Sequence, residues 1–145
     1  FKAIAAKDGI TAIKIKSSRM LLAYGFLRKV FEVFEKYKTS IDMISTSEVA
    51  VSVTIDDSRS LKEIENELRT LGSIEVDQNQ TIVCIVGDML TEKEGVLKMV
   101  FESLGGIPVR MVSFGGSPNN ISLLVDTSLK EKVLTLLNKG LFGLD

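Results

Sequence analysis

Histidine is absent from this sequence of 145 residues, and cysteine occurs once, at Cys84. The absence of histidine removes the commonest general base and the commonest transition-metal ligand, and the near-absence of cysteine excludes a thiolate zinc site as well. A single cysteine cannot form an internal disulfide, which fits a reducing compartment. The pairs Gly105-Gly106 and Gly115-Gly116 lack the spacing and the lysine of a phosphate-binding loop. We therefore expect no metal site and no catalytic residues.

Long apolar runs and a surplus of basic residues are also missing. The longest apolar run, from Ile82 to Val86, is far shorter than the ~20 residues of a membrane span. The net charge of −1 gives no surplus of cations with which to hold a nucleic-acid backbone. Hydrophobic residues make up 45% and charged residues 26%, as in soluble globular proteins. We expect a cytoplasmic protein with neither a membrane nor a nucleic acid as partner.

The residues that are present follow one pattern twice. In the first half, two-residue and helical periodicities predict a strand at Thr11–Lys16, a helix from Phe26 to Tyr37, strands at Ile41–Thr46 and Ala50–Ile55, a helix from Leu61 to Leu71 and a strand at Ile74–Val76. The second half repeats this order with a strand at Ile82–Val86, a helix at Val96–Leu104, strands at Val109–Phe114 and Ile121–Val125, and a helix at Leu129–Leu137. Gly25, Leu27 and Phe31 each recur as the same residue type 70 positions later. The sequence therefore indicates an internal duplication of a β-α-β-β-α-β unit.

The second copy lacks its closing strand, because only residues 140–145 follow its last predicted helix. The apolar segment Lys2–Ala6, by contrast, precedes the first copy and has no place in it. We predict that this segment crosses over to complete the second sheet. The expected fold class is α+β, with two ferredoxin-like modules that have antiparallel sheets and helices on one face. The first module, residues 10–78, would be inserted in the second, residues 1–7 plus 79–145.

Three motifs carry a resemblance to a known family. The runs Ser18-Arg19-Met20-Leu21 and Tyr24-Gly25-Phe26-Leu27 and the segment Ile41–Val49 resemble the first ACT module of aspartokinases, which phosphorylate aspartate on the route to lysine, threonine and methionine. The resemblance extends over the whole chain, as far as Leu141-Phe142. It implies the inserted arrangement and a non-catalytic C-terminal feedback region. ATP and magnesium would belong to an N-terminal kinase domain outside this sequence, so no cofactor is expected here.

The resemblance also implies an effector. The short tail after Leu141-Phe142 resembles monofunctional aspartokinases more than those fused to homoserine dehydrogenase, which implies L-lysine as the effector and L-threonine as the alternative. In the family the effector lies where the first modules of two chains meet, so a homodimer is implied. The second module lacks the matching motifs and is expected to be structural or dimer-forming.

A free amino acid needs donors for its carboxylate and acceptors for its ammonium groups, and the first module offers both. The amides that follow Gly25, those of Phe26 and Leu27, would hold the carboxylate at a helix start. Asp42 and Glu48 would hold the ammonium groups. The remaining candidate effector-binding residues are an apolar wall at Met20, the hydroxyls of Thr46 and Ser47, Ile41, and Ala23, which stands where some lysine-sensitive members have a polar residue.

Structural roles are the alternative for these residues. Gly25 could serve only to begin a helix, Asp42 could be a solvated charge at a strand end, Ser47 could be a turn hydroxyl and Met20 could be core. Two other classes share the strand order. An RNA-recognition module would need exposed aromatic residues on its central strands, and a small phosphatase would need an arginine and an asparagine at a phosphate loop. The sequence offers neither set.

Overall fold

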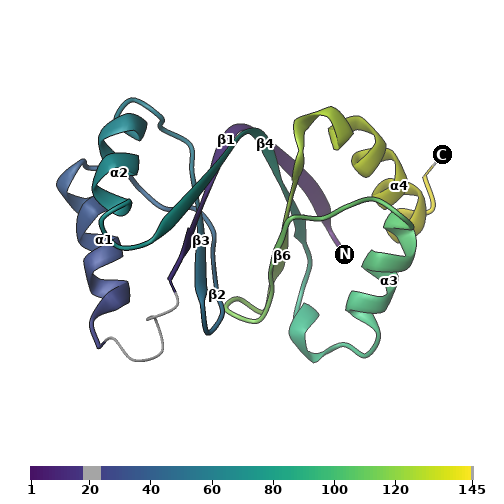
Figure 1. The fold of residues 1–145 in the computed structure, drawn as a ribbon. Coiled ribbons are helices and arrows are strands. Elements are labelled where there is room, and N and C mark those ends of the chain that lie inside the picture. Colours follow the sequence, from purple (N-terminus) through teal and green to yellow (C-terminus); the bar gives the residue numbers. More distant parts are fainter. Residues whose placement is uncertain (18–23, 145) are drawn as a thin grey trace. The chain divides into compact units, whose positions relative to one another are not determined.

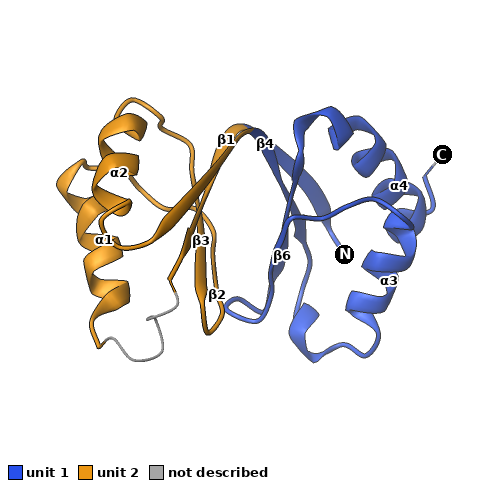
Figure 2. Ribbon diagram, in the orientation of Figure 1, with its two compact units in different colours: residues 1–8, 79–145 blue, residues 9–78 orange. Residues whose placement is uncertain are grey.

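The computed structural model describes residues 1–17 and 24–144, and it divides the chain into two compact units (Figures 1 and 2). Unit 1 comprises residues 1–8 and 79–145, and unit 2 comprises residues 9–78. Within each unit, two helices lie on one side of the strands (Figure 2). The chain therefore leaves unit 1, builds the whole of unit 2 and returns.

Unit 2 is an antiparallel sheet in the order β2-β3-β1-β4, covered by two helices. Its elements are β1 (Ala3–Lys16, of which residues 9–16 belong here), α1 (Phe26–Lys36), β2 (Ile44–Thr46), β3 (Ala50–Ile55), α2 (Leu61–Leu68) and the first part of β4 (Ser73–Val86). The β1–β3 register pairs Ile13 with Val53 and Lys14 with Ser52. Since side chains alternate along a strand, Ile13 and Val53 enter the core beneath the helices, where both are fully buried, while Lys14 and Ser52 face away from it.

Unit 1 repeats the plan in the order β1-β4-β6-β5. Its elements after β4 are a 3-10 turn η2 (Leu90–Glu92), α3 (Val96–Leu104), β5 (Met111–Ser113), β6 (Asn120–Asp126), a second 3-10 turn η3 (Thr127–Leu129) and α4 (Lys130–Phe142). The β4–β6 register pairs Val83 with Leu123 and Cys84 with Ser122. Val83 and Leu123 are fully buried against α3 and α4, in a core separate from that of unit 2.

The N-terminal segment completes the sheet of unit 1. The Lys2 amide donates a hydrogen bond of 2.7 Å to the Val86 carbonyl. At the other end of the segment, the Asp8 carboxylate accepts hydrogen bonds from the Thr81 hydroxyl at 2.9 Å and from the Lys130 ammonium at 2.8 Å. Phe1 and Ile4 pack against the unit 1 core. The predicted fold class, two ferredoxin-like modules with the first inserted in the second, is confirmed.

Several strand boundaries differ from the prediction. One strand, β1, includes most of the segment predicted at Lys2–Ala6 and all of that at Thr11–Lys16, and β5 covers only Met111–Ser113 of the strand predicted at Val109–Phe114. Segments predicted separately, at Ile74–Val76 and Ile82–Val86, belong to one strand of 14 residues, β4, which runs through the polar residues between them although Asn79 has φ 58°. The predicted strand at Ile41–Thr46 is regular only over Ile44–Thr46. Before it, the Asp42 amide donates to the Thr54 carbonyl at 2.8 Å, so this part stays hydrogen-bonded to β3 without forming a regular ladder.

The last helix is longer than predicted, since α4 continues to Phe142 instead of ending near Leu137. Gly140, which follows the predicted end of this helix, is one of its interior residues. A Cβ atom at this position would collide with the Ser103 hydroxyl oxygen. Glycine is therefore needed for close packing of α4 on α3.

Candidate functional site

The first helix of unit 2, α1, follows a glycine whose backbone conformation favours glycine. Gly25 has φ 80° and ψ 7°, in the left-handed region, and no side chain caps the helix that follows. The first turn of α1 contains no acidic residue, so the partial positive charge of this terminus is not balanced within the turn. The first amides of α1 have no acceptor within the helix, so they could donate to an anion.

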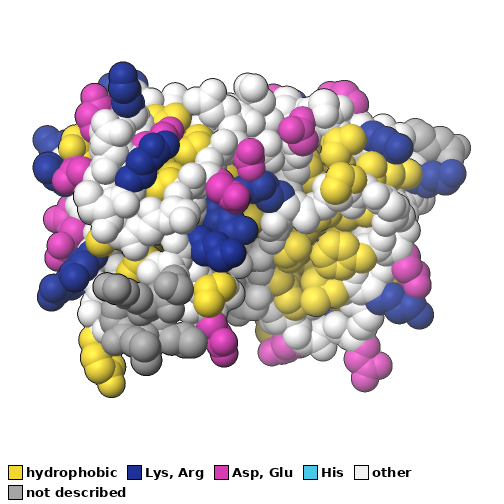
Figure 3. Space-filling model, viewed as in Figure 1, with side chains coloured by type: hydrophobic (Ala, Val, Ile, Leu, Met, Phe, Trp, Pro, Cys, Tyr) yellow, Lys and Arg dark blue, Asp and Glu magenta, His cyan; other side chains and the backbone are white. Residues whose placement is uncertain are grey.

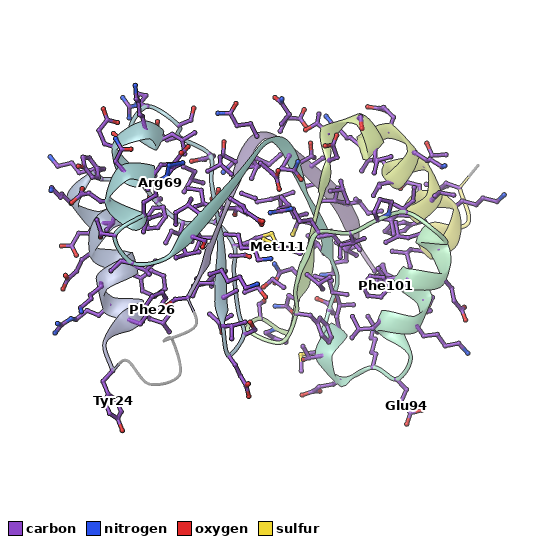
Figure 4. All side chains as sticks on the ribbon, in the orientation of Figure 1. Tyr24, Phe26, Arg69, Glu94, Phe101 and Met111 are labelled. Carbon is purple, nitrogen blue, oxygen red and sulfur yellow. The ribbon has the colours of Figure 1, made fainter. Side chains whose placement is uncertain are left out.

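The side chains at this helix start point in different directions. Phe26 is 7% exposed and belongs to the unit 2 core. Figure 4 shows Phe26 directed toward the strands and Tyr24, just before the start of α1, directed outward. The Leu27 side chain is 37% exposed, because position 27 lies off the buried stripe that Phe26, Val30 and Phe34 form. Met20 and Ala23 lie outside the described residues.

The second predicted segment forms the exposed edge of the sheet. Asp42, Thr46, Ser47 and Glu48 are exposed, whereas Ile41 is half-buried against the core. The Ser47 amide donates to the Ala50 carbonyl at 2.9 Å and closes the turn between β2 and β3. The polar side chains of the segment are therefore open to a ligand.

Within one chain, the structure brings only part of the predicted site together. The start of α1 and the turn after β2 lie at the same end of unit 2 (Figure 1). Asp42 lies four residues before Thr46, which at a rise of about 3.3 Å per residue places it about 13 Å farther along the edge. Gly25 and Thr46–Glu48 are thus near one end, and Asp42 is not part of that group.

The structure adds two lysines of β1, Lys14 and Lys16, which the sequence alone marks only as polar positions of a strand. Lys14 and Lys16 line a groove of about 300 Å³ on the face of unit 2 opposite its helices. The other lining residues come from β2, β3 and the turn between them: Ser45, Thr46, Ser47, Val49, Ala50 and Ser52. The signal in the sequence was the two-residue spacing, which puts both lysines on one face.

Charged groups with shifted pKa values lie elsewhere and fasten elements together. In unit 2, the Tyr37 hydroxyl and the Lys36 ammonium, 2.9 Å from the Glu67 carboxylate, lower the pKa of Glu67. In unit 1, hydrogen bonds from Lys130 and Thr81 lower the pKa of Asp8. Both groups of charges tie together elements of a single unit, α1 with α2 in the first case and β1 with β4 and α4 in the second.

Neither a metal centre nor a membrane span is found in the described part of the chain. No three His, Cys, Asp or Glu side chains among residues 1–17 and 24–144 are grouped as metal ligands. None of the helices in those ranges has the length and apolar character to cross a membrane. Lys, Arg, Asp and Glu are interspersed on the face shown in Figure 3.

Comparison with protein families matches both units to one description. The model of the ACT domain matches residues 4–63 and again residues 83–141. The chain belongs to the ACT domain family. Each ACT domain match falls largely within one of the two units, as an internal duplication requires.

Relatives and solved structures identify the kind of ACT region. Aspartokinase of Saccharomyces cerevisiae is 36% identical over 97% of this chain, and lysine-sensitive aspartokinase 3 of Escherichia coli is 33% identical over 98% of it. The chain spans only 28% and 33% of these two proteins. A structure assigned as a C-terminal regulatory domain of aspartate kinase from Porphyromonas gingivalis W83 is 47% identical, with a TM-score of 0.88 and 98% of both chains covered. The chain is thus a C-terminal regulatory ACT region of the aspartokinase type.

A further solved structure bears on the ligand of a relative. E. coli aspartokinase III in complex with lysine and aspartate has a TM-score of 0.88 at 33% identity, with 98% of this chain and 33% of that chain covered. Regulation by an amino acid is therefore supported for this type of region. The individual residues of the site remain predictions.

Proposed function

We propose that unit 2 binds a free end-product amino acid, L-lysine in preference to L-threonine, and that this chain transmits feedback inhibition to the kinase domain of a longer aspartokinase. The chain would regulate the transfer of phosphate to aspartate without taking part in it. The observation that carries the proposal is the uncapped start of α1 after Gly25. The similarity of this chain to E. coli aspartokinase III, whose structure contains lysine, supports this choice of effector.

The preference for lysine rests on charge. The amides after Gly25 would receive the carboxylate, and a dibasic ligand then has two ammonium groups that need acidic partners. Asp42 and Glu48 are both exposed on the segment that includes β2. Threonine has one ammonium group and would need only one of these two acids.

The separation of Asp42 from the helix start favours a site shared by two chains. In the described part of unit 2, β2 has a neighbour, β3, on one side only, so its other side is an open edge. Ile44 at 41% exposure and Val49 at 42% add apolar surface to this edge. Pairing of two such edges would cover both strands in a homodimer and let one chain supply the helix start while the second supplies Asp42.

Calorimetry of the 145-residue chain against L-lysine and L-threonine tests the effector. Asp42→Asn and Glu48→Gln should each weaken lysine binding by on the order of 1.5–3 kcal/mol, the range for hydrogen bonds to charged groups. Glu35→Gln is the matched control, because Glu35 is exposed near the far end of α1 and should leave binding unchanged. Heat of binding from threonine with none from lysine would refute the effector assignment.

Mixing two variants tests whether the binding site is shared between two chains. Gly25→Ala breaks the proposed helix start and Asp42→Asn breaks the proposed acidic partner, so each homodimer should bind lysine poorly. An equal mixture that exchanges chains should recover about one quarter of the sites, because half of the dimers are mixed and each contains one intact site. A site contained in one chain would recover none.

A further inference from the structure

We propose that the open face of unit 2 holds a second binding site, for a small dianion such as inorganic phosphate or a dicarboxylate, built around Lys14 and Lys16. Its ligand is different from the amino-acid effector proposed above, although the two proposed sites share Thr46 and Ser47. It rests on two hollows that share one lysine, on the absence of acids from their linings, and on a comparison with the duplicated unit.

Two hollows meet at Lys16. The groove of about 300 Å³ contains Lys14 and Lys16 together with the hydroxyls of β2 and β3. A second hollow, of about 440 Å³, is lined by Lys16, Ser17, Arg69, Thr70, Leu71, Gly72 and Ser73. The first volume is at the lower end of the range for small-molecule sites, about 300–1,000 Å³. Among the described residues that line them, there is no aspartate or glutamate.

The backbone that carries Lys16 is held in place from both sides. Lys16 pairs with Ala50 in the β1–β3 ladder. On the other side, a Cβ atom at Gly72 would collide with the Lys16 carbonyl oxygen, so the two backbones are in direct contact there. A fixed backbone lowers the conformational entropy that the lysine loses when it binds a ligand.

The charge of the two lysines is largely available. The Lys14 ammonium lies 3.8 Å from the Glu75 carboxylate, whose side chain is 70% exposed, and an ion pair this open contributes little. Lys16 forms no ion pair with any residue of the ranges 1–17 and 24–144. Two ammonium groups spaced two residues apart on one strand face suit a ligand with more than one anionic oxygen.

Unit 1 shows that the fold does not require these cations. In the β4–β6 ladder, Cys84 pairs with Ser122 and Val86 pairs with Asn120. These pairs correspond to Lys14 with Ser52 and Lys16 with Ala50 in unit 2, 70 residues earlier. The duplicated face therefore keeps the serine but has Cys84 and Val86 in place of both lysines. The basic groove is a property of unit 2 and not of the architecture.

The lining also distinguishes this ligand from a free amino acid. The hollows contain the donor-only cations Lys14, Lys16 and Arg69, and their hydroxyls can donate to an anion as well as accept from an ammonium group, so the charge of the lining favours an anion. A dibasic ligand would be repelled by Lys14 and Lys16. The site shares Thr46 and Ser47 with the predicted effector segment, but its charge preference is opposite.

Amide chemical shifts of the labelled 145-residue chain, titrated with inorganic phosphate at constant ionic strength, test the proposal. We expect saturable shifts at Lys16, Ser45 and Ser47, and Lys16→Ala should weaken binding about tenfold or more. Lys62→Ala, which removes an exposed lysine of α2, should leave the affinity unchanged, and Lys16→Arg should retain binding.

Succinate in place of phosphate distinguishes the two sources of a dianion, and saturation by either compound at these residues supports the proposal. Shifts that do not saturate with either compound would overturn it, as would equal losses from Lys16→Ala and Lys62→Ala. A parallel titration with L-lysine reports on the proposed effector separately, so failure of one proposal is distinguishable from failure of the other.

Discussion

A single methyl group at Gly25 should separate ligand binding from stability, because the duplication provides a matched control. Gly25 has φ 80° before α1, and Gly95 has φ 73° before α3. A Cβ atom at either position would meet no atom of residues 1–17 or 24–144 within 4 Å. Alanine at either site should therefore cost about 1–2 kcal/mol from the left-handed backbone alone, without a steric clash.

The expected outcomes differ only in binding. Thermal unfolding of Gly25→Ala and of Gly95→Ala should show similar decreases in Tm, about 4–16 °C for a cost of about 1–2 kcal/mol in a unit of about 70 residues. In calorimetry, Gly25→Ala should weaken L-lysine binding about tenfold or more, because its methyl projects into the open space beside the first α1 amides. Gly95→Ala should bind as the parent chain does.

Two results would refute this reasoning. Equal loss of lysine binding in both variants would mean that the effect comes from general destabilisation or that unit 1 also binds the ligand. Unchanged binding in Gly25→Ala would mean that the carboxylate does not approach the helix start. The second result would remove the uncapped helix start from the proposed site, and the first would remove the proposed difference between the two units.

Three further changes test the architecture. Deletion of residues 1–6 should speed amide exchange in the β4 and β6 strands of unit 1 while β3 of unit 2 stays protected, and early loss in β3 would contradict the insertion. Gly140→Ala should destabilise unit 1 by about 1–3 kcal/mol through overpacking, and Ser103→Gly in the same chain should restore part of that loss in a denaturant titration. Because the pKa of Glu67 is lowered, its contribution to stability is present above the ordinary glutamate pKa and is lost as the pH falls through the folded value. The stability difference between the parent chain and Glu67→Gln should therefore shrink in acid, and a pH-independent difference would contradict this.

Periodicity was sufficient for the elements with one buried face. Alternation at Ile13 and Ile15 predicted β1, and helical spacing predicted α1 and α3 within a residue or two of their observed starts. The spare apolar segment before the first copy and the missing strand after the second were enough to predict the insertion. These features depend on the positions of the apolar residues, which can be read directly from the sequence.

Features that depend on contacts between distant residues were not predictable in this way. The extension of α4 to Phe142 depends on Gly140 meeting Ser103 on another helix, whereas glycine by itself suggests a helix end. The groove around Lys14 depends on the β1–β3 register, which places Ser52 beside it.

The insertion also sets the order in which the chain can fold as it is made. Unit 2 is continuous, so residues 9–78 can fold as soon as they have left the ribosome. In unit 1, the N-terminal part of β1 cannot pair until its partner in β4 has been synthesised. Synthesis of the roughly 70 residues between them, at 5–20 residues per second, takes about 4–14 s. During that time Phe1 and Ile4, which later pack in the unit 1 core, have no partner strand from unit 1 on the nascent chain. A chaperone that binds short apolar segments would therefore find its target at the start of this region and not at its end.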